Sequence, residues 1–126
     1  MKEIVSTEDA PAAVGAYSQA TSEGDLVFTA GQIALTPDGD DRTNEPVADQ
    51  VEQCLDNLSA VLEAADSGLD QVLKTTIYLG DIDDYSEVNE VYSSYFDENP
   101  PARSAFAVAA LPKGAAVEIE AVATRA

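Results

Sequence analysis

Residues 72–79 read VLKTTIYL, and this run decides the fold because it predicts a strand between two helical patterns. Most of the run is β-branched or aromatic, and such side chains favour strands. Successive side chains of a strand point to opposite faces of its sheet. This alternation puts one set of side chains on a single face: Leu73, Thr75, Ile77 and Leu79.

Two amphipathic helices are predicted on either side of this strand. In residues 46–65, apolar residues recur at three- and four-residue spacing, and Gly68 is placed to end the helix. After the strand, Asp84 followed by Glu87 resembles a capping sequence, and an apolar stripe continues over residues 85–96. Each helix has one apolar face, so both are expected to cover a sheet.

The remaining strands are predicted in the two ends of the chain, at residues 2–5, 17–21, 25–30, 102–109 and 117–125. Residues 32–35 are expected to continue the strand 25–30 after a kink at Gly31. The order is strands, helix, strand, helix, strands. It predicts an α+β fold, a mixed β-sheet with two helices packed on one face, and a single domain over residues 1–126.

The charge balance is strongly acidic. The chain has 24 Asp and Glu against six Lys and Arg, a net charge of -18, and the acids are spread along its whole length. Such a surface stays hydrated at high salt, where screening weakens self-repulsion, so we expect a halophilic adaptation. An acidic patch for a basic partner is the alternative. Nucleic acid binding is disfavoured because phosphate contacts need a basic patch.

The chain contains no His, which excludes Ser-His-Asp and Cys-His catalysis and the metal sites that need imidazole. Its one cysteine, Cys54, lies on the apolar stripe of the first helix and is interpreted as a core residue. A single unpaired thiol, the absence of an apolar signal segment in residues 1–10 and the absence of a long apolar run predict a cytoplasmic protein that does not span a membrane.

Arg103 is the leading candidate for chemistry. It begins the strand 102–109, and alternation places it on one face with Ala105, Ala107 and Ala109, which leaves open space around a cation. The planar guanidinium matches a carboxylate with two hydrogen bonds. The alternative is a surface salt bridge to one of the many acids.

Glu118 and Glu120 are candidates because they lie on one side of the last strand, where a carboxylate can position and deprotonate a water. A solvated acidic face is the alternative. Gly31, at a strand end, can let the backbone approach a ligand, or it can serve a bulge. Tyr17 is an aromatic residue of the core or of a pocket rim.

Several runs, in order and at suitable spacing, resemble the RidA/YjgF family of enamine/imine deaminases. They are GAYSQA (15–20), TAGQI (29–33), KTTIYL (74–79), VN (88–89), PARS (101–104) and VEIEA (117–121). The resemblance implies a chorismate-mutase-like homotrimer with sites between subunits. It also implies hydrolysis of 2-iminobutanoate and 2-iminopropanoate to 2-oxo acids and ammonia, with no metal or organic cofactor.

By the same resemblance, Arg103 binds the substrate carboxylate and Glu118 activates the water. Gly31 and Ala105 supply backbone contacts, and Tyr17 walls the pocket. Many members carry Cys at position 105 and Pro at position 16, where this chain has Ala. A non-catalytic binding module for small 2-oxo acids is the alternative function, because it uses the same Arg103 contact without needing Glu118.

Overall fold

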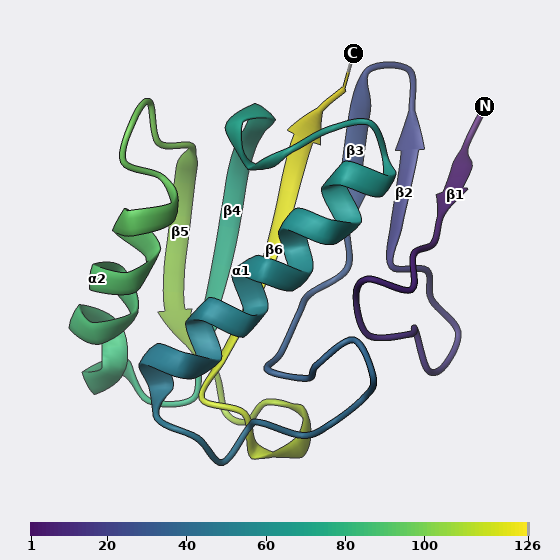
Figure 1. Cartoon of the computed structure of the whole chain (residues 1–126). Helices are drawn as coiled ribbons and strands as arrows, with labels where there is room; N and C mark the ends of the chain where they lie inside the picture. The colour runs from purple at the N-terminus through teal and green to yellow at the C-terminus, as the bar shows by residue number, and fades with distance from the viewer. Residues whose placement is uncertain (126) are drawn as a thin grey trace.

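The computed structural model describes residues 1–125, which form a six-stranded sheet with two helices on one of its faces (Figure 1). The elements in chain order are β1 (Glu3–Val5), β2 (Ala20–Glu23), β3 (Leu26–Thr29), α1 (Val47–Ala64), β4 (Val72–Leu79), α2 (Tyr85–Tyr95), β5 (Ala102–Ala107) and β6 (Val117–Thr124). Short 3-10 turns lie at Leu69–Gln71, Ile82–Asp84 and Pro112–Gly114. The predicted α+β class and the mixed sheet are confirmed.

The strands lie in the order β1-β2-β3-β6-β4-β5, so β1 and β5 are the edges. β4 and β5 are parallel, with α2 between them in sequence, and the other pairs are antiparallel. On the two sides of β4, Thr75 lies opposite Arg103 of β5 and Tyr78 lies opposite Glu118 of β6. These two rows are three residues apart along β4, so they belong to opposite faces of the sheet.

The core lies between α1 and the helix-facing side of the sheet. Leu55, Leu58 and Leu62 of α1 are fully buried and belong to one cluster with Ile77 of β4 and Ile119 of β6. Each such side chain stabilises the fold by about 1.5–3 kcal/mol through removal from water. None of the helices within residues 1–125 is long and apolar enough to cross a bilayer.

The predicted alternation along β4 is wrong at Leu73. The pairing of β4 with β6 shifts between Val72 and Lys74, which is a β-bulge at Leu73. The bulge turns Leu73 outward, where it is 50% exposed, while Val72 takes the buried place. Alternation resumes after the bulge, so Thr75, Ile77 and Leu79 share one face as predicted, and all three are buried.

Two predicted strands near the N-terminus are also placed differently. The strand predicted at 17–21 begins later, as β2 at 20–23, because Gln19 belongs to a loop. Its side chain accepts from the backbone N–H of Thr7 and donates to the carbonyls of Thr7 and Pro11. Residues 32–35 form no strand, only isolated bridges from Gln32 to Ile119 and from Leu35 to Asp41.

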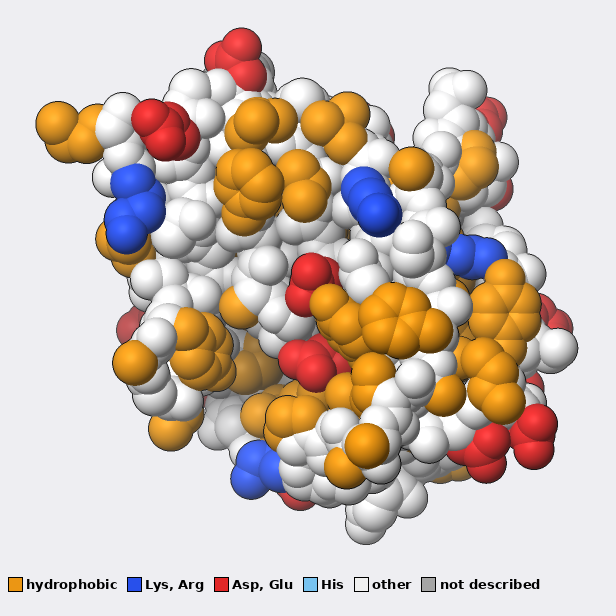
Figure 2. All heavy atoms as spheres, turned by 180° about the vertical axis from the view of Figure 1, so that it is seen from behind, with side chains coloured by type: hydrophobic (Ala, Val, Ile, Leu, Met, Phe, Trp, Pro, Cys, Tyr) orange, Lys and Arg blue, Asp and Glu red, His pale blue; other side chains and the backbone are white. Residues whose placement is uncertain are grey.

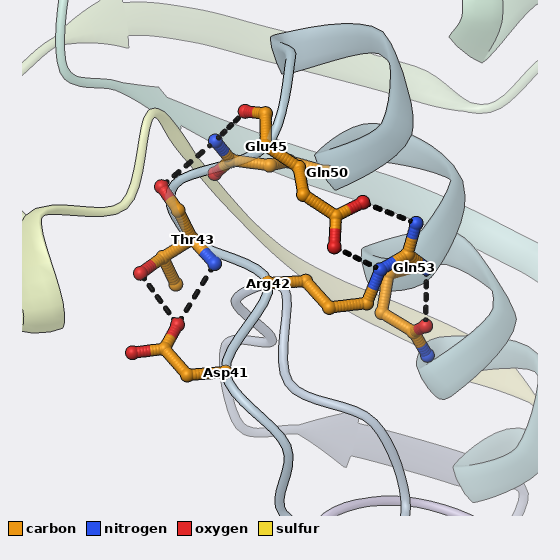
Figure 3. Close-up of polar contacts among 6 residues, drawn as sticks. All are labelled: Asp41, Arg42, Thr43, Glu45, Gln50 and Gln53. Atoms are coloured by element: carbon orange, nitrogen blue, oxygen red, sulfur yellow. Dashed lines mark hydrogen bonds and ion pairs between the residues drawn. The ribbon is translucent and has the colours of Figure 1, made fainter.

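Side-chain hydrogen bonds fasten the loop 36–45 to α1 (Figure 3), and others join the loop and α1 to the segment before β6. The Gln50 amide donates to the carbonyls of Thr43 and Glu45, and its oxygen accepts from the backbone N–H of Ala116. Arg42 donates to both oxygens of Glu45 and to Gln53. Because Gln50 is buried, the loss of one of these bonds would leave a polar group unsatisfied.

The bulge gives a direct test through two identical substitutions. Leu58→Ala empties a site that is 1% exposed, so we expect it to lower the free energy of unfolding by about 2–5 kcal/mol. Leu73→Ala should change it by no more than about 0.5 kcal/mol, because that side chain is half in water already. Urea unfolding followed by circular dichroism measures both. Equal losses would place Leu73 in the core, as simple alternation predicts.

Candidate functional site

Arg103 extends from the edge strand β5 toward α2. Its neighbour across the ladder, Thr75, is buried and shares a hydrogen bond of 2.7 Å with the Tyr92 hydroxyl of α2. Arg103 therefore lies on the helix-facing side of the sheet, and Ala105, opposite the buried Ile77, lies on the same side. The predicted shared face of Arg103 and Ala105 agrees with this register.

Neutral groups of α2 hold the guanidinium of Arg103. One terminal nitrogen donates to the Asn89 side-chain oxygen at 2.8 Å, and the other donates to the Tyr85 hydroxyl at 2.7 Å. The guanidinium carbon lies 4.9 Å from the ring centre of Tyr92 and 5.6 Å from that of Tyr85. Tyrosine rings attract a cation at such distances without neutralising it.

The alternative of a salt bridge for Arg103 finds no support, because no carboxylate pairs with Arg103 in the described residues 1–125. The expected open space among alanines is wrong, since tyrosine rings of α2 occupy that side. A cavity of about 370 Å³ nevertheless reaches the guanidinium. It is lined by Asn89, Tyr92, Ser93, Phe96, Pro100, Pro101 and Arg103, which we call the Arg103 pocket.

A second cavity brings together three of the predicted site residues, Tyr17, Gly31 and Glu118. This Glu118 pocket, of about 470 Å³, is lined by Pro11, Ala12, Val14, Tyr17, Gln19, Gly31, Gln32, Ile33, Leu35, Pro112, Lys113 and Glu118. Tyr17 lies before β2 in the N-terminal loop, where its hydroxyl accepts from the backbone N–H of Val14 at 3.3 Å. Its side chain is 55% exposed, so it forms a rim and not core.

The Glu118 carboxylate lies where a side chain at residue 31 would be. A Cβ at residue 31 would lie 2.9 Å from both Cγ and Cδ of Glu118, closer than carbon atoms approach, and would overlap a carboxylate oxygen. The bridge between Gln32 and Ile119 holds the two backbones side by side at this point. A residue without a side chain therefore lets the carboxylate lie directly against the chain.

The Glu118 carboxyl is electrostatically unusual. Partial burial, and then the like charge of Glu120 two residues away, raise its pKa above the ordinary value of a glutamate. Glu120 has a similar influence on Tyr78, whose pKa is raised first by burial and then by this carboxylate. A carboxylate whose pKa is moved toward neutrality is better suited to accept a proton from water.

The structure does not bring Arg103 and Glu118 together in one chain. Glu118 lies opposite Tyr78 on the uncovered face of the sheet, whereas Arg103 lies opposite Thr75 on the helix-covered face. Figure 2 shows this uncovered face, where acidic side chains are set among hydrophobic ones. The exposed aromatic residues of the face include Phe28 and Phe106.

The sequence reasoning missed Lys113 and the partners of Arg103 in α2. Tyr85, Asn89 and Tyr92 are four and three residues apart, which is one helical face, but the pattern of residues 85–96 predicts only an apolar stripe. Lys113 carried no sequence signal for a site. Cys54 is buried as predicted, and burial raises the pKa of its thiol, so it is no nucleophile. No cluster of metal-ligating side chains occurs among residues 1–125.

Comparisons with known proteins agree with the resemblance in the motifs. The family model described as Endoribonuclease L-PSP matches residues 7–125. The chain is 45% identical over 125 residues to the 2-iminobutanoate/2-iminopropanoate deaminase of Rattus norvegicus, with 99% of this chain and 91% of that protein covered.

Solved structures give the same result. The crystal structure of YEO7_yeast superposes with a TM-score of 0.97 at 44% identity and covers 100% of both chains. That of E. coli TdcF with bound serine gives 0.93 at 38% identity, with 98% of this chain and 99% of the other covered. The chain therefore belongs to the Endoribonuclease L-PSP family, which is the RidA/YjgF family that its motifs resemble.

Proposed function

We propose that this protein hydrolyses small 2-imino acids, such as 2-iminobutanoate and 2-iminopropanoate, to 2-oxo acids and ammonia. The observation that carries the proposal is the guanidinium of Arg103, which is fixed by Asn89 and two tyrosines, borders a cavity and pairs with no carboxylate within residues 1–125. Such a cation binds the carboxylate of a substrate. The name of the rat relative supplies the substrate class.

Glu118 acts in this proposal as the general base. It takes a proton from water while the oxygen adds to the C=N carbon, and the imine nitrogen is protonated. The resulting carbinolamine expels ammonia and leaves the C=O of the oxo acid, so one water enters for each ammonia released. Arg103 holds the carboxylate and moves no proton. Fixing the substrate beside the water supplies much of the acceleration.

The proposed site requires two copies of the chain, because Arg103 and Glu118 occupy opposite faces of one sheet. We propose the homotrimer that the family resemblance implies, with the Arg103 pocket of one copy facing the Glu118 pocket of the next. The uncovered face of the sheet, with Phe28 and Phe106 each nearly half exposed, offers apolar area for this assembly. Arg103 on the edge strand β5 lies near the rim that a neighbour would approach.

We further propose a cytoplasmic location and adaptation to a salty interior. A buried, unpaired Cys54 fits a reducing compartment. No Asp or Glu of the described chain belongs to the buried set, so the net charge of -18 is carried in contact with solvent. Salt screens the resulting repulsion.

The proposal predicts a division of roles between the two residues. Arg103→Ala should lower kcat/KM for imine hydrolysis about 100-fold, because the substrate loses its orientation. Glu118→Gln should lower kcat about 100-fold or more while 2-oxobutanoate still binds. Glu120→Gln is the matched control and should keep most of the turnover. The measurement is ammonia release from enzymatically generated 2-aminoacrylate in high-salt buffer, corrected for the spontaneous reaction.

Two results would contradict this mechanism. If the Arg103→Ala variant turns over at an unchanged rate, Arg103 does not bind the substrate carboxylate. Ligand binding without turnover in the unaltered protein and in Glu118→Gln alike would favour the binding module for 2-oxo acids.

The pH profile provides a second prediction. Glu118 must be ionised to act as a base, and its pKa is raised, so the acidic limb of kcat/KM should lie above the usual pH for a glutamate. Glu120→Gln removes a like charge and makes ionisation of Glu118 easier, which should move this limb to lower pH. If the acidic limb stays in place or moves to higher pH, it does not report the ionisation of Glu118.

A third prediction concerns Gly31. Gly31→Ala should abolish most of the turnover, because the new methyl group must displace the Glu118 carboxylate. The same change should lower the free energy of unfolding by about 1–3 kcal/mol in the unaltered protein, and by much less in a Glu118→Ala background that has no side chain to clash. Thermal or urea unfolding of the four proteins completes this cycle. Equal costs in both backgrounds would show that another contact requires the glycine.

A further inference from the structure

Lys113 is the basic side chain of the Glu118 pocket. It lies in the 3-10 turn Pro112–Gly114 just before β6, whereas Glu118 comes from the strand itself. The two cavities therefore have one basic side chain each, Arg103 in the first and Lys113 in the second. The proposed reaction uses Arg103 for the substrate carboxylate and leaves the charge of Lys113 without a role.

The backbone at Lys113 is held in an unusual conformation. Its φ of 57° and ψ of 18° fall in the left-handed region, which residues with a side chain adopt at a cost. The Thr43 hydroxyl lies 2.6 Å from the Asp41 carboxylate and 3.1 Å from the Lys113 carbonyl, so its single proton is shared between these two acceptors, and the Thr43 N–H also donates to Asp41. The loop that α1 fastens through Gln50 thus sets the place of Lys113 at the pocket.

The charge of Lys113 remains available for a ligand. No ion pair joins it to a carboxylate in the part of the chain that the structure describes. Asp41 is near enough for Lys113 to contribute to lowering its pKa, although the hydrogen bonds from Thr43 contribute more. In a protein with 24 acids, an exposed, unpaired cation at the wall of a cavity favours an anion on its own side of that cavity, away from Glu118.

The size of the pocket points in the same direction. Cavities of roughly 300–1,000 Å³ hold drug-sized ligands. The Glu118 pocket of a single chain, at about 470 Å³, is larger than 2-iminobutanoate requires, and in the proposed assembly a neighbouring copy would cover its mouth. With its C=N carbon beside Glu118 and its first carboxylate on Arg103 of another copy, a longer substrate would have room to extend its side chain within the same pocket.

We propose that Lys113 binds a second anionic group on the substrate side chain, so that this site also accepts imines of dicarboxylic amino acids. The inference rests on the proposed deaminase function and extends its substrate class. The chemical step is unchanged: water adds to the C=N carbon, ammonia leaves, and a dicarboxylic 2-oxo acid is formed. Lys113 contacts the substrate away from the reacting carbon and therefore determines specificity.

Binding of two 2-oxo acids to the assembled protein tests this assignment. Lys113→Met should weaken 2-oxoglutarate about threefold to fivefold, the effect of one exposed charge pair, and should leave 2-oxobutanoate unchanged. Lys113→Arg should retain 2-oxoglutarate. Lys2→Met is the matched control, because it removes an equal charge at an exposed position outside the Glu118 pocket. Isothermal titration gives the affinities, and the same ratio is expected in kcat/KM for the two corresponding imines.

The outcomes separate the two proposals. Equal effects of Lys113→Met on both ligands, or no effect on either, overturn the role of Lys113 while Arg103-dependent turnover of 2-iminobutanoate still supports the deaminase. Absence of binding and turnover with either ligand overturns both. Thr43→Val, which removes the hydroxyl on the Lys113 carbonyl, should reproduce the selective loss of 2-oxoglutarate in weaker form.

Discussion

The alternation of side chains across a single sheet is the constraint on which the rest of the molecule depends. β4 lies between β5 and β6, and its register puts Thr75 in line with Arg103 and Tyr78 in line with Glu118. The odd spacing along β4 sends the cation to the helix-covered face and the base to the uncovered one. No change of rotamer can bring the two groups together through the sheet. Chemistry that needs both must therefore recruit another copy.

The chain has few cations, so each of them has a large effect on the electrostatic potential around it. Arg42 and Arg125 are neutralised by Glu45 and Glu3, and they tie the loop 36–45 and the chain ends to the fold. Arg103 and Lys113 have no such partner in residues 1–125, and both border cavities. An anion that approaches this acidic protein meets repulsion over most of the surface and less of it near these two groups. The same charge distribution that favours solubility thus restricts where a carboxylate can bind.

The sequence was sufficient for the class of fold, and its family resemblance implied one site for Tyr17, Gly31 and Glu118, but three local features were not predicted. Period-two alternation cannot locate a bulge, so the pattern places Leu73 on the same face as Thr75, Ile77 and Leu79. Strand propensity predicted a strand at 17–21 because it takes no account of the Gln19 side chain, which donates to carbonyls of the N-terminal loop. The small residues after Arg103 suggested empty space. The sequence does not show which helix packs beside this strand, so the tyrosines of α2 were not expected there. The spacing of Tyr85, Asn89 and Tyr92 shows that they share one face of a helix, and this was the signal for a polar contact with a strand residue.

The choice of Asn89 explains how Arg103 can be both fixed and available. An amide oxygen accepts the same hydrogen bond as a carboxylate but carries no net charge, so the guanidinium is oriented without being neutralised. The two tyrosine rings stabilise the cation through their faces, and the bond from Tyr92 to Thr75 anchors one of them to β4. An aspartate at position 89 would form an internal ion pair, and a substrate carboxylate would then have to compete with it. Neutral support of the cation therefore leaves its charge uncompensated.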